Sequence, residues 1–117
     1  MGKAFSPENS LFGRRLREAR LRAGLAQDKL GVMIGLDEGS SSARMSRYEN
    51  GVHEPAFVWV EKIADALKIP AAYFYCDDDR LAEIILAYSA LPEKRQKSLH
   101  AYAADLTGAA HKPTVIL

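Results

Sequence analysis

Residues Gln27–Gly51 read QDKLGVMIGLDEGSSSARMSRYENG, and this stretch decides the fold. Its apolar spacing predicts two short helices joined by a turn. Met45 and Tyr48 share one side of the second helix and are expected to be buried. The other side carries small polar and cationic residues, namely Ser42, Ala43, Ser46 and Arg47. A helix built in this way is suited to the major groove of DNA, because one side packs on the protein while the other meets base edges.

The length of 117 residues predicts one domain with a small appendage. A hydrophobic content of 48% is ample for a core, and a charged content of 26% is ordinary for a globular protein. No apolar run approaches the roughly 18 residues that a membrane span needs, and the N-terminus lacks a signal-peptide pattern. Since the single cysteine, Cys76, cannot form an internal disulfide, we expect a cytoplasmic protein that does not bind membranes.

The charge distribution argues only weakly for a polyanionic partner. The formal net charge is +1, whereas nucleic-acid-binding domains are often strongly basic. Residues 1–76 carry a net charge of +2 and residues 77–117 a net charge of −1. Five arginines fall between Arg14 and Arg22, so we expect any positive field to be local. The plain alternative for this cluster is a solvated helix face, with Arg14 and Arg17 as the members that would add phosphate contacts.

Helical periodicity and turn residues predict an all-α chain with no strand. The expected helices span residues 11–23, 27–34, 42–48, 55–68, 80–90 and 92–106, with one more helical turn at 71–75. Ser10 is expected to cap the first helix, and Ser40 or Ser41 the third, after a loop over Leu36–Ser40. We therefore divide the chain into a flexible arm (1–10), a first domain (11–76), a C-terminal helical extension (77–107) and a tail (108–117).

The sequence resembles the XRE-type helix-turn-helix regulators, which share the fold of lambda-like phage repressors. The most specific matching string is Ser46–Gly51, SRYENG, and the likeness covers about Leu11–Phe74. The other matching residues are Phe12-Gly13, Leu16-Arg17, Arg20, Ala23-Gly24-Leu25, Gln27, Leu30, Gly35-Leu36, Met45, Glu54-Pro55, Ile63-Ala64 and Leu67. The resemblance implies a lambda repressor-like five-helix domain, here with one or two extra C-terminal helices. It also implies double-stranded DNA as the partner and no cofactor.

The resemblance carries specific residues into a DNA-binding site. The implied DNA-binding set is Gln27, Ser41, Ser42, Ala43, Arg44, Ser46, Arg47 and Asn50. Gln27 would contact a phosphate, and Arg47 is the best candidate for bidentate readout of guanine. Arg44 would reach base edges or the DNA backbone, depending on register. Arg20 and Glu49 would form a partly buried structural ion pair.

The chain departs from the family pattern at three places. Ala26 stands where the family usually has a capping Ser or Thr, and Gly31 stands where it usually has Ala. Asp37–Ser41 carries about four more residues than the usual short turn, which leaves the start of the third helix open. The plain alternatives are a solvent-facing Gln27 and an Arg47 that pairs with a nearby carboxylate on the protein surface.

The C-terminal helices carry more apolar surface than a closed five-helix core needs. We expect them to form a homodimer interface, centred on Leu81, Ile84, Ile85, Tyr88, Leu99 and Tyr102. A dimer suits a palindromic operator, because two recognition helices read two half-sites one helical turn apart. The leading hypothesis is thus a sequence-specific transcriptional regulator. The alternatives are an antitoxin or adaptor whose C-terminal helices bind a partner protein, and a helical interaction module without a DNA role.

The sequence gives no support for an enzyme or a metal protein. It contains no phosphate-binding glycine loop, no nucleophile elbow and no paired His/Glu motif. His53, His100 and His111 lack metal-ligand spacing. The run Asp77–Asp79 lacks the spacing and closing glutamate of a calcium loop. We expect neither catalysis nor a metal.

Overall fold

The structure, a computed structural model, describes residues 10–108 of the chain, and over this range it is all helical. The elements are α1 Leu11–Arg22, α2 Gln27–Met33, α3 Glu38–Glu49, α4 Phe57–Leu67, the 3₁₀ helix η2 Ala71–Tyr75, α5 Asp79–Ala90 and α6 Glu93–Thr107. The all-α fold predicted from the sequence is confirmed. The expected arm and tail fall on residues that lie, apart from Ser10 and Gly108, outside the described range.

The ends of α1 follow from local sequence. The hydroxyl oxygen of Ser10 accepts a hydrogen bond from the backbone N–H of Gly13 at 3.1 Å, which caps the helix as expected. Gly24 follows the C-cap with φ +71°, a conformation that glycine adopts without penalty. Between these ends Phe12 and Leu16 are buried on the face turned toward the core.

The start of α3 differs from the sequence prediction. The predictions of a loop over Leu36–Ser40 and of Ser40 or Ser41 as N-cap are wrong, because α3 already begins at Glu38 after Asp37 as its N-cap, and the connection from α2 is short. Gly35, with φ +103°, turns the chain there. Ser41 lies inside the molecule, and its hydroxyl donates a hydrogen bond to the Asp28 carbonyl oxygen at 2.7 Å. The residues that look like an inserted loop are thus an extra N-terminal turn of α3.

Close approach of α2 and α3 explains the glycine inside α2. A Cβ atom on Gly31 would lie 1.8 Å from the Ser41 hydroxyl oxygen and 3.2 Å from Met45 Cγ. Glycine in a helix interior costs about 1 kcal/mol relative to alanine. The tight contact between α2 and α3 leaves no room for a Cβ atom at Gly31, which explains why glycine stands there despite this cost.

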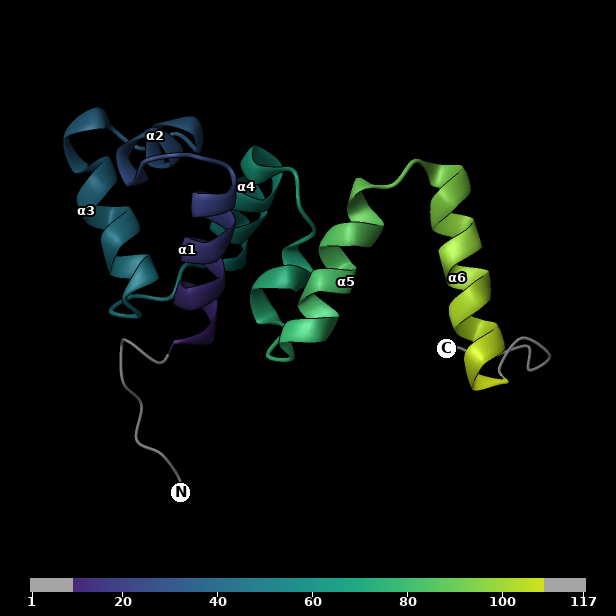
Figure 1. Cartoon of the computed structure of the whole chain (residues 1–117). Coiled ribbons are helices and arrows are strands. Elements are labelled where there is room, and N and C mark those ends of the chain that lie inside the picture. Colours follow the sequence, from purple (N-terminus) through teal and green to yellow (C-terminus); the bar gives the residue numbers. More distant parts are fainter. Residues whose placement is uncertain (1–9, 109–117) are drawn as a thin grey trace, which may run out of the picture.

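The core lies among α1, α2, α3, α4 and η2 (Figure 1). Its large fully buried side chains are Tyr73, Phe74, Leu16, Leu30, Met45, Ile63 and Val60. α4 begins at Phe57 with Ala56 as its N-cap, two residues later than the expected start at Pro55. We call residues 10–75 the head.

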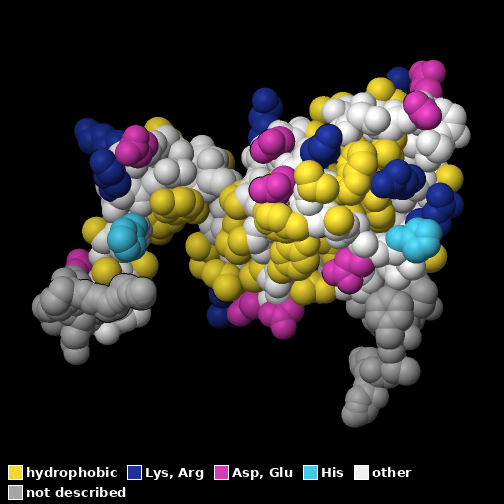
Figure 2. Space-filling view, turned by 180° about the vertical axis from the view of Figure 1, so that it is seen from behind, with side chains coloured by type: hydrophobic (Ala, Val, Ile, Leu, Met, Phe, Trp, Pro, Cys, Tyr) yellow, Lys and Arg dark blue, Asp and Glu magenta, His cyan; other side chains and the backbone are white. Residues whose placement is uncertain are grey.

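α5 and α6 extend from the head. From here on, the arm means residues 79–107, and not the N-terminal segment 1–10. α5 packs against η2, whereas α6 packs against α5 and buries none of its residues. Figure 1 shows α6 standing away from the head. In Figure 2, hydrophobic side chains lie on both sides of the notch between α6 and the rest of the molecule.

Candidate nucleic-acid interface

The outer face of α3 presents small and polar side chains around one arginine. Its exposed members are Gly39, Ser42, Ala43, Arg47 and Asn50, and Ser46 is half-buried. The Asn50 amide donates a hydrogen bond to the Ser46 hydroxyl oxygen at 3.2 Å. The backbone carbonyl of Arg47 accepts hydrogen bonds from Val52 and His53, but its guanidinium forms no hydrogen bond or ion pair with another residue of the range 10–108. Its guanidinium is therefore available to an external acceptor.

The inner face of α3 fixes the helix on the head. Met45 and Tyr48 are buried, as the sequence pattern predicts. Gly13 of α1 touches the end of α3 so closely that a Cβ atom there would lie 2.2 Å from the Glu49 carbonyl oxygen. These contacts hold α3 from behind, so that its outer face projects from the head.

A buried hydrogen-bond network joins α1, α2 and α3. Arg20 donates from Nε and Nη2 to the Glu49 carboxylate, at 2.5 and 3.2 Å, and from Nη1 to the Leu25 carbonyl oxygen at 2.8 Å. Gln27 donates from its amide nitrogen to Glu49 Oε1 at 3.0 Å. Bidentate pairing supplies the hydrogen bonds that a buried carboxylate needs. The bond also fixes the orientation of the Gln27 amide at the start of α2, a contact between distant residues that the sequence pattern does not predict.

Two residues of the expected DNA-binding set lie elsewhere. Ser41 is fully buried against α2, so the prediction that it contacts DNA is wrong. The Arg44 guanidinium lies over the Trp59 ring at 4.8 Å from its centroid, and Arg44 Nε donates to the Tyr48 hydroxyl at 2.9 Å. Arg44 is therefore directed toward α4 and is not grouped with the exposed residues of α3. Both placements depend on contacts between helices, which periodicity within α3 does not reveal.

Most of the arginines on α1 form ion pairs within the protein. Arg14, Arg15 and Arg22 pair with carboxylates, as Arg20 does. Of the five, only Arg17 has no ion pair to another residue of the described part of the chain. The cluster that suggests a local positive field is thus mainly a set of structural contacts.

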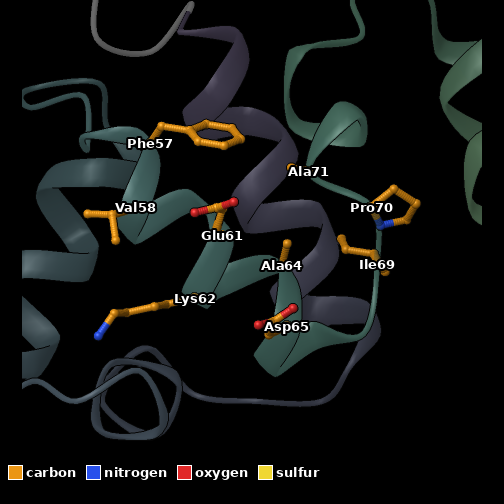
Figure 3. A pocket seen from close by; sticks show the side chains of 9 residues that line it. All are labelled: Phe57, Val58, Glu61, Lys62, Ala64, Asp65, Ile69, Pro70 and Ala71. Atoms are coloured by element: carbon orange, nitrogen blue, oxygen red, sulfur yellow. The ribbon is translucent and has the colours of Figure 1, made fainter.

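A shallow hollow runs along α4 (Figure 3). It lies between α4 and the segment that leads to η2, and its charged side chains are Glu61, Lys62 and Asp65. Glu61 and Asp65 form no ion pair with other residues in 10–108, and the Lys62 ammonium lies 5.1 Å from the Trp59 ring centroid. No group of three His, Cys, Asp or Glu side chains in the described range is arranged to hold a metal ion. Nor does that range contain a helix long and apolar enough to cross a membrane.

Comparisons with known proteins agree with this geometry. A family model for a helix-turn-helix domain matches residues 11–72. The crystal structure of the transcriptional regulator BswR matches with a TM-score of 0.78 and 42% sequence identity, covering 84% of this chain and 98% of that chain. A comparison with curated proteins finds no significant match. The matched segment contains α1–α4 and the exposed face of α3, and the chain therefore belongs to the helix-turn-helix family of transcriptional regulators.

Proposed function

We propose that the protein binds a palindromic DNA operator as a homodimer, through the outer face of α3. The observation that carries this proposal is the contrast between the two sides of α3. Its inner side chains are buried, whereas the Arg47 guanidinium projects without a partner in the described structure. A rigid helix with an available guanidinium and small neighbours is suited to close approach to base edges.

Each residue of this face has a distinct proposed role. Arg47 forms a bidentate contact to the O6 and N7 acceptors of guanine. Ser42, Ala43 and Ser46 contact neighbouring base edges, because their short side chains let the helix enter deeply. Gln27 and Asn50 contact the sugar-phosphate backbone and fix the register of the helix. The Gln27 amide keeps one N–H for a phosphate, since only one of its two hydrogens is needed for the bond to Glu49.

The proposed homodimer forms through the groove between α5 and α6. This groove has a volume of about 780 Å³, and its lining is almost entirely apolar. It is lined by Pro70, Ile84, Ile85, Tyr88, Leu99, His100, Tyr102, Ala103 and Leu106. Tyr102 is 63% exposed and Leu106 70% exposed, which is unfavourable for a helix in water without a partner. A second copy would cover the groove and give two recognition helices for two half-sites.

The same groove supports a second candidate, in which the arm binds an amphipathic helix of another protein. An antitoxin or adaptor of this fold would use the groove in that way. Monomeric protein that binds DNA without self-association would favour this candidate over the homodimer.

Selection of binding sites from random duplex DNA tests the proposal, and a palindrome is the expected result. On the selected operator, Arg47→Ala is expected to cost about 1–3 kcal/mol and to relax the sequence preference. Gln27→Ala should weaken binding more evenly across sequences. Arg80→Ala is the matched control, because Arg80 is an exposed arginine on α5. Equal, sequence-independent losses for Arg47→Ala and Gln27→Ala would contradict base readout by Arg47.

A further inference from the structure

The arm meets the head where α5 packs against η2 and buries Ala82, and ion pairs also join α5 to α1. Two carboxylates one helical turn apart on α5, Asp79 and Glu83, face arginines of α1. Arg14 and Arg15 pair with Asp79, and Arg22 pairs with Glu83. We call these five residues the ionic clamp. Because α1 also packs against α3, the ionic clamp links the orientation of the arm to the orientation of α3.

Arg15 is the central member of the clamp, and its side chain is only 3% exposed. It donates from Nε to the Cys76 carbonyl oxygen at 2.8 Å and from Nη2 to Asp79 Oδ1 at 2.9 Å. Its Nη1 donates to Glu18 at 3.0 Å, and its guanidinium lies 5.5 Å from the Tyr73 ring centroid. One rigid guanidinium thus holds both the backbone that leaves η2 and the first residue of α5.

The two exposed ion pairs, Arg14–Asp79 and Arg22–Glu83, orient α5 more than they stabilise the fold. The Arg14–Asp79 distance is 3.3 Å, and the Arg22–Glu83 pair lies further along α5 at 2.5 Å. Exposed pairs of this kind each contribute little to the free energy of unfolding. Two contacts at different points along α5, however, restrict its rotation about the connecting segment. The Arg15 hydrogen bond, followed by that from Arg14, also holds the pKa of the Asp79 carboxyl below its ordinary value, so Asp79 stays charged.

We propose that the ionic clamp fixes the angle between the arm and α3, and so determines which half-site spacing the dimer accepts. This inference rests on the proposed function, since spacing has meaning only for a dimer on two half-sites. One inserted base pair moves a half-site by roughly 3.4 Å and turns it by about 35° around the DNA axis. A rigid link between head and arm tolerates one spacing, whereas a loose link tolerates several.

The first test measures the angle without DNA. Fluorescent labels are placed at exposed positions in the head and at the far end of α5, by Lys29→Cys and Ala90→Cys. An excess of unlabelled chain ensures that the energy transfer measured is within one chain, and the buried Cys76 of the parent protein gives the labelling blank. We expect one narrow distance distribution in the parent protein. We expect a broader or shifted distribution in the double variant Asp79→Ala, Glu83→Ala.

The matched control is the double variant Glu61→Ala, Asp65→Ala. It removes the same charge from exposed carboxylates on α4 that are not paired within the described structure, and its distribution should equal that of the parent protein. A broad distribution in the parent protein, or equal distributions in all three proteins, would overturn the inference. Neither result depends on DNA binding, so this test can fail while the proposed DNA-binding function still holds.

The second test uses the selected operator with its two half-sites moved apart or together by one base pair at a time. We expect the parent protein and the control to prefer one spacing by about tenfold, and the clamp variant by less than about threefold. The molecular mass in solution should stay dimeric in all three. An unchanged spacing profile in the clamp variant would overturn the inference, whereas a parent protein that selects no palindrome would contradict the proposed function instead.

Discussion

α1 and α6 are two amphipathic helices of the same chain that have opposite fates. α1 has 12 residues and buries six of them, whereas α6 has 15 residues and buries none. Both carry apolar residues at helical spacing. The stripe of α1 is covered by α3 and η2, whereas the main neighbour of α6 in the described structure is α5. An apolar stripe therefore shows that a helix needs a partner, but not that the partner belongs to the same chain.

The head is held together by contacts within one chain, whereas the arm presents a surface suited to contacts with another molecule. The head encloses the core cluster and pairs its buried side-chain polar groups within the described structure, including the buried pair between Arg20 and Glu49. The arm leaves an apolar groove open. Substitutions in the head should thus change the free energy of unfolding, while substitutions in α6 should change association and leave the fold of one chain intact.

The largest effect is expected in the head, from Glu49→Ala. This change leaves the Arg20 guanidinium buried without its carboxylate, which should destabilise the protein by about 3–5 kcal/mol. Chemical denaturation checks the value. Glu38→Ala on the same helix is the control, because Glu38 is exposed, and its effect should be small. Similar losses for both variants would argue against a special role for the buried pair.

In the arm, Tyr102→Glu should dissociate the proposed dimer and weaken operator binding by about a hundredfold. The reason is that a charge would lie in the apolar groove between α5 and α6. Light scattering measures the mass, and a gel shift measures binding. Ala101→Glu adds the same charge next to it, at an exposed position outside the groove lining, and should remain dimeric. A parent protein that is monomeric at all concentrations would contradict the dimer.

Two glycines allow a finer test of packing in the head. Gly31→Ala places a Cβ atom against the Ser41 hydroxyl and should cost about 1–3 kcal/mol of stability. Gly39→Ala introduces the same atom into open space near the start of α3 and should stabilise the protein by up to about 1 kcal/mol. Thermal unfolding of both variants measures the difference. Equal melting temperatures would show that α2 and α3 are not packed as closely as the structure indicates.

The smallest expected effect is the loss, at low pH, of the stability that the charged Asp79 carboxylate contributes between head and arm. The pKa of Asp79 is lowered from its ordinary value of 3.8, chiefly by the Arg15 hydrogen bond. Its contribution to stability is therefore complete above about pH 3.8 and is lost as the pH falls through the lowered pKa in the folded state. The difference in melting temperature between the parent protein and Asp79→Asn should be small at neutral pH and should vanish in strong acid. A difference that grows in acid would contradict this assignment.

The sequence predicted the helical elements and most of the exposed face of α3. Ser42, Ala43 and Arg47 are exposed where the spacing indicates, and Met45 and Tyr48 are buried. These features are local, because the direction of a side chain on a helix follows from its position along the chain. The same rule showed that the last two helices carry apolar stripes.

The start of α3 and the positions of two expected site residues required the tertiary structure. Ser41 is buried by a contact with α2, and the direction of the Arg44 side chain is set by its contact with Trp59 of α4. Nor did the sequence indicate that Arg15 would be buried, because its partner Asp79 lies 64 residues further along the chain.

The amino-acid sequence by itself thus determined which segments are helical and which sides of them are apolar, since these depend on spacing within one segment. Only the tertiary structure decided which arginines are free for an external partner and which apolar stripe stays uncovered. Those outcomes depend on contacts between segments that are distant in the chain, and periodicity carries no information about such contacts.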